Sequence, residues 1–176
     1  MIKKYKSEMS SSKRTGSQTQ KQRPARKTSR PKQQQKKTFT HGKLRVIALG
    51  GLEEVGRNMM LVEYDKEIIT IDMGLQFPEE DMPGIDYIIP NIAYLSDKKD
   101  RIKGSIITHG HVDHIGAIPH VMGEIGNPPM YMGKLTAGLV RKRCEEYRTC
   151  PKLNIAEINE SSRVRMGKHF TVEFLR

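Results

Sequence analysis

Cysteine is scarce in this sequence of 176 residues, and no apolar run is long enough to cross a membrane. The two cysteines, Cys144 and Cys150, have no second pair, so neither a disulfide framework nor a cysteine-based zinc site is expected. We interpret them as unpaired thiols, which together with ten methionines fit a reducing cytoplasm. An apolar segment of the kind found in secretory signals is also lacking.

Acidic residues are nearly absent from residues 1–43, where Glu8 stands against 14 lysines and arginines. Residues 44–176 hold 17 basic and 19 acidic residues, so the chain's formal charge of +11 originates in the tail. The tail also has too few apolar residues to offset the entropy of ordering, and we expect it to be disordered. Three interpretations stay open: a solubilising tail, a salt-sensitive attraction to RNA or ribosomes, and an organelle transit peptide, although no amphipathic apolar face recurs.

Order is expected from Leu44 onward, where apolar patterns replace the polar tail. The patterns predict strands and helices separated by glycine- and proline-rich loops, without internal repeats. The predicted strands cover 44–51, 59–64, 68–74, 104–108, 130–132, 162–167 and 169–176, and the predicted helices cover 114–125 and 135–147, the second capped near Thr136. This order indicates an α/β fold in which helices pack outside a sheet.

Three of the six histidines gather in the stretch THGHVDHIGAIP, directly after a predicted strand. In an extended segment His109 and His111 point the same way, while Asp113, which could also cap the helix, and His114 turn the corner into it. Imidazole and carboxylate are ligands that zinc prefers, and two ligands for each of two ions is sterically simpler than four around one. Surface-loop histidines are the competing interpretation, and the apolar strand and helix on either side argue against it. Two adjacent metals would acidify a water and neutralise charge on a phosphoryl or carbonyl group, so the cluster predicts a hydrolytic site.

The histidine stretch resembles the signature of the metallo-β-lactamase superfamily, whose fold is an αβ/βα sandwich with two zincs at one edge. The stretches LGGLEEVGRNM and IDMGLQFPEEDMPGIDYIIPNIAYL are more specific, and resemble the ribonuclease J family of the β-CASP branch. The similarity covers roughly residues 44–176 and excludes the tail. The resemblance therefore implies the amino-terminal part of a metallo-β-lactamase domain, truncated before the third metal motif and the β-CASP domain.

This resemblance also implies an activity: a zinc-dependent ribonuclease, both 5′-to-3′ exonuclease and endonuclease, in RNA maturation, rRNA processing and mRNA decay. His109 and His111 would bind one zinc, and Asp113 and His114 the other, with a zinc-bound hydroxide attacking the phosphorus in line. Asp72 would hold a ligand histidine by a hydrogen bond. The implied partners are RNA and, beyond it, ribosomes or other RNA-decay proteins, with no membrane, a cytoplasmic location and a homo-oligomeric state.

The sequence departs from the family where a third motif would supply a further histidine, a bridging aspartate and a last histidine. His120, in a predicted helix, and His169, in a strand turn, do not lie in such a context, so we expect residues 1–176 alone to be inactive. A small-molecule metallo-hydrolase of the glyoxalase or lactamase kind is a second interpretation, although the two specific stretches are not expected in one. A non-catalytic RNA-binding fragment is a third, favoured by the missing ligands.

Overall fold

The computed structural model of the chain describes residues 42–175, so the predictions made for the tail lie outside the described residues. Six strands form one mixed sheet in sequential order. They are β1 (Leu44–Gly50), β2 (Met59–Tyr64), β3 (Glu67–Ile71), β4 (Ile102–Ile106), β5 (Met130–Gly133) and β6 (Ile155–Ile158). The first three strands are antiparallel and β3 to β6 are parallel, so the carboxyl ends of β3, β4 and β5 meet at one edge.

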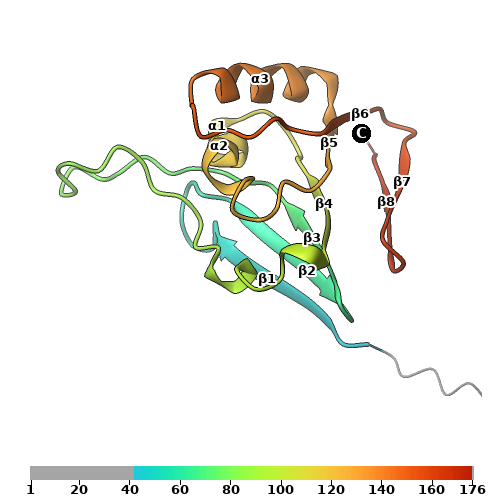
Figure 1. Cartoon of the computed structure of the whole chain (residues 1–176). Coiled ribbons are helices and arrows are strands. Elements are labelled where there is room, and N and C mark those ends of the chain that lie inside the picture. Colours follow the sequence, from blue (N-terminus) through green and yellow to red (C-terminus); the bar gives the residue numbers. More distant parts are fainter. Residues whose placement is uncertain (1–41, 176) are drawn as a thin grey trace, which may run out of the picture. The chain divides into compact units, whose positions relative to one another are not determined.

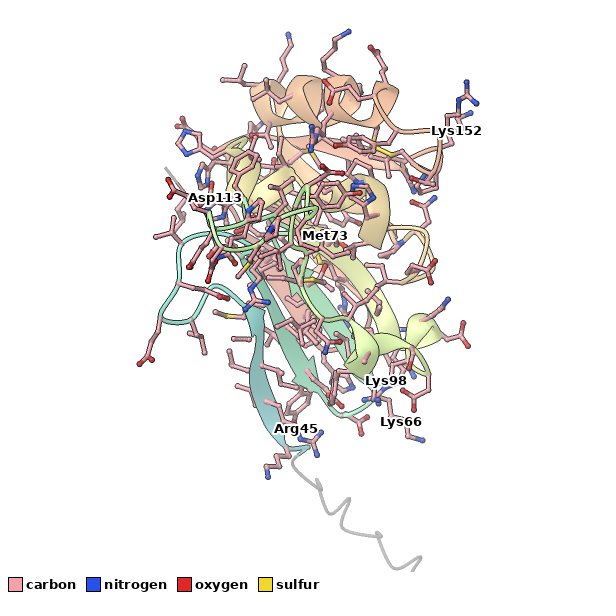
Figure 2. The ribbon with its side chains drawn as sticks, turned by 90° about the vertical axis from the view of Figure 1, so that its left-hand side faces the viewer. Arg45, Lys66, Met73, Lys98, Asp113 and Lys152 are labelled. Carbon is pink, nitrogen blue, oxygen red and sulfur yellow. A yellow bond between two sulfur atoms is a disulfide. The ribbon has the colours of Figure 1, made fainter. Side chains whose placement is uncertain are left out.

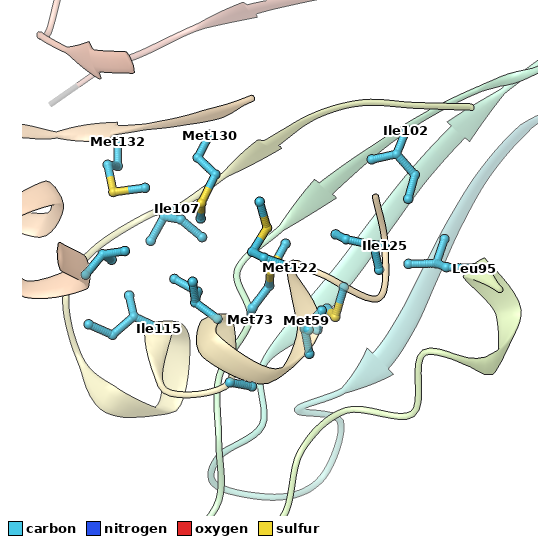
Figure 3. Close-up of a cluster of buried hydrophobic side chains, with 14 of the residues drawn as sticks. Met59, Met73, Leu95, Ile102, Ile107, Ile115, Met122, Ile125, Met130 and Met132 are labelled. Carbon is cyan, nitrogen blue, oxygen red and sulfur yellow. The ribbon is translucent and has the colours of Figure 1, made fainter. Parts of the chain in front are cut away.

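Helices cover one face of the sheet (Figure 1). They are α1 (Val112–Ile115), α2 (Ile118–Val121) and α3 (Lys134–Glu145), with the short 3-10 turns η1 (Ala93–Leu95) and η2 (Lys99–Arg101). Apolar side chains from β2 to β5 and from α1 to α3 fill the space between (Figure 3). A polar pair also lies in the middle of this face. The hydroxyl of Thr70 donates to that of Ser105 at 2.7 Å, and both residues are buried. None of the helices in residues 42–175 has the length and apolar character that a membrane span requires.

A two-stranded hairpin, β7 (Arg163–Met166) and β8 (Phe170–Glu173), lies on the opposite face of the sheet (Figure 1). Met166 of the hairpin is buried, and its sulfur lies 3.0 Å from where a Cβ of Gly104 would stand. The carboxylate of Glu67 ties down the turn of the hairpin by accepting hydrogen bonds from the backbone N–H groups of Lys168 and His169. The first residue of β3 therefore fixes a segment a hundred residues later in the chain.

The single helix predicted over 114–125 is wrong, because α1 and α2 are separate turns. The backbone N–H of Ala117 donates to the carbonyl of Met73 at 2.9 Å, and the carbonyl of Asp113 accepts from Asn58 at 3.1 Å. A continuous helix would join Ala117 to Asp113, so these two hydrogen bonds to other segments interrupt it. Pro119 lies in the first turn of α2, as its missing N–H requires.

Two predictions near α3 also need correction. The helix begins at Lys134, and the residue before it makes no side-chain cap; Thr136 is buried within the helix. The two cysteines, interpreted as unpaired thiols, form a disulfide that joins Cys144 of α3 to Cys150 after the helix. Cys144 lies in the last turn of α3 and Cys150 follows six residues later, so the chain can fold back far enough for the two side chains to meet.

Strand β6 was not anticipated, since Ile155–Ile158 is short and half-buried with a weak apolar alternation. It exists because its backbone pairs in parallel with β5. The remaining predicted strands are confirmed within a few residues at either end.

Candidate metal centre

The histidine cluster follows β4 at the edge where the carboxyl ends of the parallel strands meet. Figure 2 shows Asp113 at this end of the molecule, far from Arg45 and from Lys66 in the β2–β3 turn. Backbone hydrogen bonds join the cluster to the segment after β3, because Met73 donates to the carbonyl of His114 at 2.8 Å. Two segments that are forty residues apart in the sequence therefore form one corner of the sheet.

Asp72 is the first residue after β3 and lies under the cluster with only 6 % of its surface exposed. Its backbone is in the left-handed region, with φ of 60°, which turns the side chain away from the strand direction. Its carboxylate accepts hydrogen bonds from the backbone N–H of Thr108 at 2.8 Å and lies 2.9 Å from Nδ1 of His114. A carboxylate can only accept, so Nδ1 of His114 carries a proton, and in the neutral form of the ring Nε2 keeps its lone pair.

Thr108 extends this network to a second histidine. Its Oγ1 lies 2.9 Å from Oδ2 of Asp72 and 3.0 Å from Nδ1 of His109. A hydroxyl has one proton, so when it donates to the carboxylate it must accept from Nδ1 of His109. Nε2 of His109 then also keeps its lone pair, and the imidazole rings of His109 and His114 lie with centroids 4.1 Å apart.

The atoms of the cluster that could bind a metal lie in two pairs. Nε2 of His109 lies 3.1 Å from Nδ1 of His111, and Nε2 of His114 lies 3.3 Å from Oδ2 of Asp113. Two ligands of a tetrahedral zinc, each at about 2.0–2.1 Å, stand about 3.3–3.4 Å apart, so each pair has nearly the spacing that zinc requires. In residues 42–175 no three His, Cys, Asp or Glu side chains are arranged around one metal. The described residues therefore offer two pairs of possible metal ligands and no complete metal site.

Sequence reasoning missed Gly74, which determines how closely the two segments approach. A Cβ at this position would lie 1.5 Å from the carbonyl oxygen of Asp113, far inside any contact distance. The N–H of Gly74 donates to the carbonyl of Asn58 at 2.9 Å, so a third segment crosses at the same point. The IDMG stretch carries this signal, since a glycine two residues after a strand-end aspartate indicates a close backbone approach.

Asn58 was also missed, although it lies in the LGGLEEVGRNM stretch. The backbone N–H of Asn58 donates to the carbonyl of Asp113, and the side-chain amide of Asn58 lies 3.2 Å from Oδ2 of Asp113.

The predicted capping role of Asp113 is wrong, because His111 occupies the N-cap of α1 and no side chain caps it.

The other described histidines lie in different surroundings. The ring of His120 stacks on Tyr87 with centroids 4.7 Å apart, and meets the edge of Tyr147. Burial, and then the nearby charge of Arg143, hold the pKa of His120 below its ordinary value. His169 lies in the hairpin turn, 3.8 Å from Asp65 at the opposite end of the sheet. Neither histidine joins the cluster.

The sequence of this chain is similar to proteins of a known superfamily. Residues 52–148 match the family model described as the metallo-beta-lactamase superfamily. Ribonuclease J of Synechocystis is 40% identical over 133 residues, and ribonuclease J 1 of Streptococcus pyogenes is 43% identical over 131 residues. These alignments cover 76% and 74% of this chain, but 21% and 23% of the relatives.

Among solved structures, a B3 metallo-β-lactamase with an active-site glutamic acid matches 70% of this chain and 46% of its own, at 17% identity and a TM-score of 0.45. The chain spans about a fifth of the length of the ribonuclease J relatives. The expected resemblance to these relatives is confirmed by the sequence identity. The family model covers more than half of the sequence and includes all four residues of the cluster. The chain therefore belongs to the metallo-β-lactamase superfamily.

Proposed function

We propose that this chain carries part of the active site of a zinc-dependent ribonuclease that hydrolyses RNA phosphodiester bonds as a 5′-to-3′ exonuclease and as an endonuclease. The observation that carries the proposal is the pair of two-atom donor sets at one sheet edge, His109 with His111 and Asp113 with His114. The similarity to ribonuclease J relatives supports RNA as the substrate.

Each residue of the centre has a distinct task in this proposal. His109 and His111 would hold one zinc, and Asp113 and His114 would hold the other. Bound zinc would supply Lewis-acid chemistry, which acidifies a water and neutralises negative charge on the phosphoryl group. Asp72 holds the proton of His114 on Nδ1 directly, and Thr108 extends the same arrangement to Nδ1 of His109. Both Nε2 atoms would then be available to bind a metal.

The wider context follows from the substrate. An enzyme that matures rRNA and degrades mRNA works where those RNAs are, so we place it in the bacterial cytoplasm, in contact with RNA and with ribosomes or other RNA-decay proteins. We also propose a homo-oligomeric state for the protein made from its complete gene.

The test uses the protein expressed from its complete gene, loaded with zinc. Single-stranded RNA with a labelled 5′ end should be cleaved, and either His111→Ala or Asp113→Ala should abolish cleavage while RNA affinity stays within about twofold. These two side chains create the nucleophile and do not hold the polymer. Near-normal turnover of either variant at saturating zinc would overturn the two-metal assignment.

A small-molecule hydrolase of the same superfamily is the alternative, because the cluster alone serves both reactions. A thioester and a β-lactam assayed beside RNA distinguish the two. Turnover of the thioester or the β-lactam without RNA cleavage would replace the ribonuclease proposal. Zinc-independent RNA binding without any turnover would indicate a non-catalytic RNA-binding protein.

A further inference from the structure

The side chain of Asn58 reaches the metal centre from outside the histidine stretch. Its Nδ2 donates to the carbonyl of Asp113 at 3.1 Å and to Oδ2 of Asp113 at 3.2 Å. Nδ2 also lies 3.4 Å from Nε2 of His114. The backbone of the same residue forms two further hydrogen bonds, from its N–H to the carbonyl of Asp113 and from Gly74 to its own carbonyl.

The hydrogen count of this amide is informative. A primary amide has two N–H groups, and both are directed to oxygen atoms of Asp113. None is left for Nε2 of His114, which therefore keeps its lone pair for a metal. Because the amide is uncharged, it fixes the direction of the Asp113 carboxylate without competing for the cation or for the carboxylate's charge.

The loop before Asn58 is held in an uncommon backbone conformation. Gly51, Glu53, Gly56 and Arg57 all have positive φ values, of 82°, 57°, 115° and 38°. Non-glycine residues keep such a conformation only where their surroundings enforce it. A Cβ on Gly56 would lie 2.7 Å from the Cβ of Gln76, so the loop also packs closely against the segment after β3.

An ion pair closes this loop. The carboxylate of Glu54 accepts hydrogen bonds from Nε and Nη2 of Arg57 at 2.8 and 2.7 Å, and from the backbone N–H of Gly51 at 2.9 Å. The hydrogen bonds from Arg57 and Gly51 hold the pKa of Glu54 below its ordinary value. A two-pronged guanidinium–carboxylate pair restricts direction as well as distance, so it fixes the residue that directly follows Arg57.

We propose that Asn58 is a positioning residue for the metal centre: its amide holds the Asp113 carboxylate beside Nε2 of His114, and the Glu54–Arg57 pair fixes the loop that places it. The inference rests on the proposed function, because it assigns a further residue to the same centre. It also explains why the LGGLEEVGRNM stretch combines glycines, an ion pair and an asparagine.

The first experiment compares Asn58→Ala with the unaltered protein from the complete gene. Zinc retained per chain is measured after dialysis against a graded series of chelator concentrations, beside kcat and KM for RNA. Zinc affinity of one of the two positions should fall about 10- to 100-fold, as is typical when a residue that orients a ligand is removed. The value of kcat should fall with KM unchanged, since Asn58 orients a ligand and does not bind the polymer.

Asn127→Ala is the matched control, because it removes an amide-to-carbonyl hydrogen bond of 3.0 Å to Lys152, outside the metal centre. It should leave zinc affinity unchanged. Glu54→Gln is the second variant, in case Asn58→Ala does not fold, and it should weaken zinc in the same direction by less. If Asn58→Ala only lowers the unfolding midpoint and zinc affinity is unchanged, the positioning role is wrong. When only Glu54→Gln folds, unchanged zinc affinity in that variant overturns the role.

The zinc and RNA measurements separate the two proposals. Weakened zinc in Asn58→Ala, together with no RNA cleavage by the unaltered protein, would overturn the ribonuclease proposal and keep the positioning role. If the unaltered protein cleaves RNA and Asn58→Ala binds zinc as tightly as the control Asn127→Ala, the positioning role is overturned and the ribonuclease proposal is kept.

Discussion

At the scale of single residues, hydrogen-bonding capacity decides which nitrogen atoms of the cluster stay free. Asp72 can only accept, and Thr108 has one proton to give. Together they place the protons of His114 and His109 on Nδ1 and leave both Nε2 atoms available. The tautomers of two histidines therefore follow from one buried carboxylate and one hydroxyl.

Thr108→Val tests this network, because valine keeps the shape of threonine and removes the hydroxyl. The His109 ring should lose its fixed orientation, and zinc affinity at the position that His109 shares with His111 should fall about tenfold, within the range usual for such outer contacts. Thr108→Ser keeps the hydroxyl and should retain the original affinity. The zinc affinity of both variants is measured by competition with a chelator. Equal zinc affinities of Thr108→Val and Thr108→Ser would show that the hydroxyl has no such role.

Gly74→Ala tests the close approach at Gly74, and Gly138→Ala serves as the comparison. A methyl group there meets the carbonyl of Asp113, so Gly74→Ala should lower the free energy of unfolding by about 1–3 kcal/mol or more. Gly138 lies exposed in α3 with nothing near its missing Cβ. Gly138→Ala should raise the free energy by about 0.5–1 kcal/mol, because alanine favours a helix. Urea unfolding of both variants gives the comparison, and a loss of the same size in each would contradict it.

At the scale of elements, long-range hydrogen bonds decide where helices stop and where a hairpin lies. The bond from Ala117 to Met73 divides the helical stretch after the cluster into α1 and α2. Glu67, with 8 % of its surface exposed, holds the β7–β8 turn through two backbone N–H groups. Burial alone would raise the pKa of Glu67, but the hydrogen bonds from Lys168 and His169 outweigh it and hold the pKa below its ordinary value.

Glu67→Gln should weaken the attachment of the hairpin. A neutral amide oxygen accepts less strongly than a carboxylate, so the variant should lose about 1–3 kcal/mol near pH 7, and the amides of Lys168 and His169 should exchange faster with deuterium. A lowered carboxyl pKa contributes stability above about pH 4.3, the ordinary glutamate value, and loses it as pH falls through the folded-state pKa. The difference between the two proteins should therefore shrink below about pH 4.3. A difference that stayed constant with pH would exclude the carboxylate charge as its source.

At the scale of the whole molecule, the described residues bring the proposed metal ligands together in pairs and not in larger sets. Metal affinity depends on ligand number and on preorganisation. We expect the protein from the complete gene to retain two zincs, and residues 1–176 alone to bind zinc weakly. Mass spectrometry under native conditions counts the bound ions, and two chelator-resistant zincs on residues 1–176 would contradict the assignment of the ligands.

The basic tail gives a second prediction at this scale. If its 14 lysines and arginines contact RNA, affinity should fall steeply with salt, by a log–log slope of about 0.7 for each phosphate neutralised on a single strand. Tyr5 and Phe39 are its only aromatic residues, so stacking on bases should add little. RNA affinity measured across a salt series with and without residues 1–43 tests this. Identical slopes would leave the solubilising interpretation in place.

The sequence by itself determined the features that depend on neighbouring residues. The apolar alternation of β2 and β3 and the turn between them are local patterns, and both predicted what the structure contains. The spacing of His109, His111, Asp113 and His114 is also a local pattern, and the metal site that it indicates stays a prediction. The resemblance to ribonuclease J came from contiguous motifs in the same way.

Tertiary structure alone decided the features that depend on partners far along the chain. The break between α1 and α2, the pairing of β6 with β5, the disulfide and the place of Asn58 beside Asp113 all involve atoms brought together by folding. The helix pattern predicted over 114–125 contains no sign that Met73 and Asn58 take two of the backbone hydrogen bonds at its start. Local propensity is a weak preference of a few tenths of a kcal/mol per residue, up to about 1, and a buried backbone group that finds a partner elsewhere outweighs it.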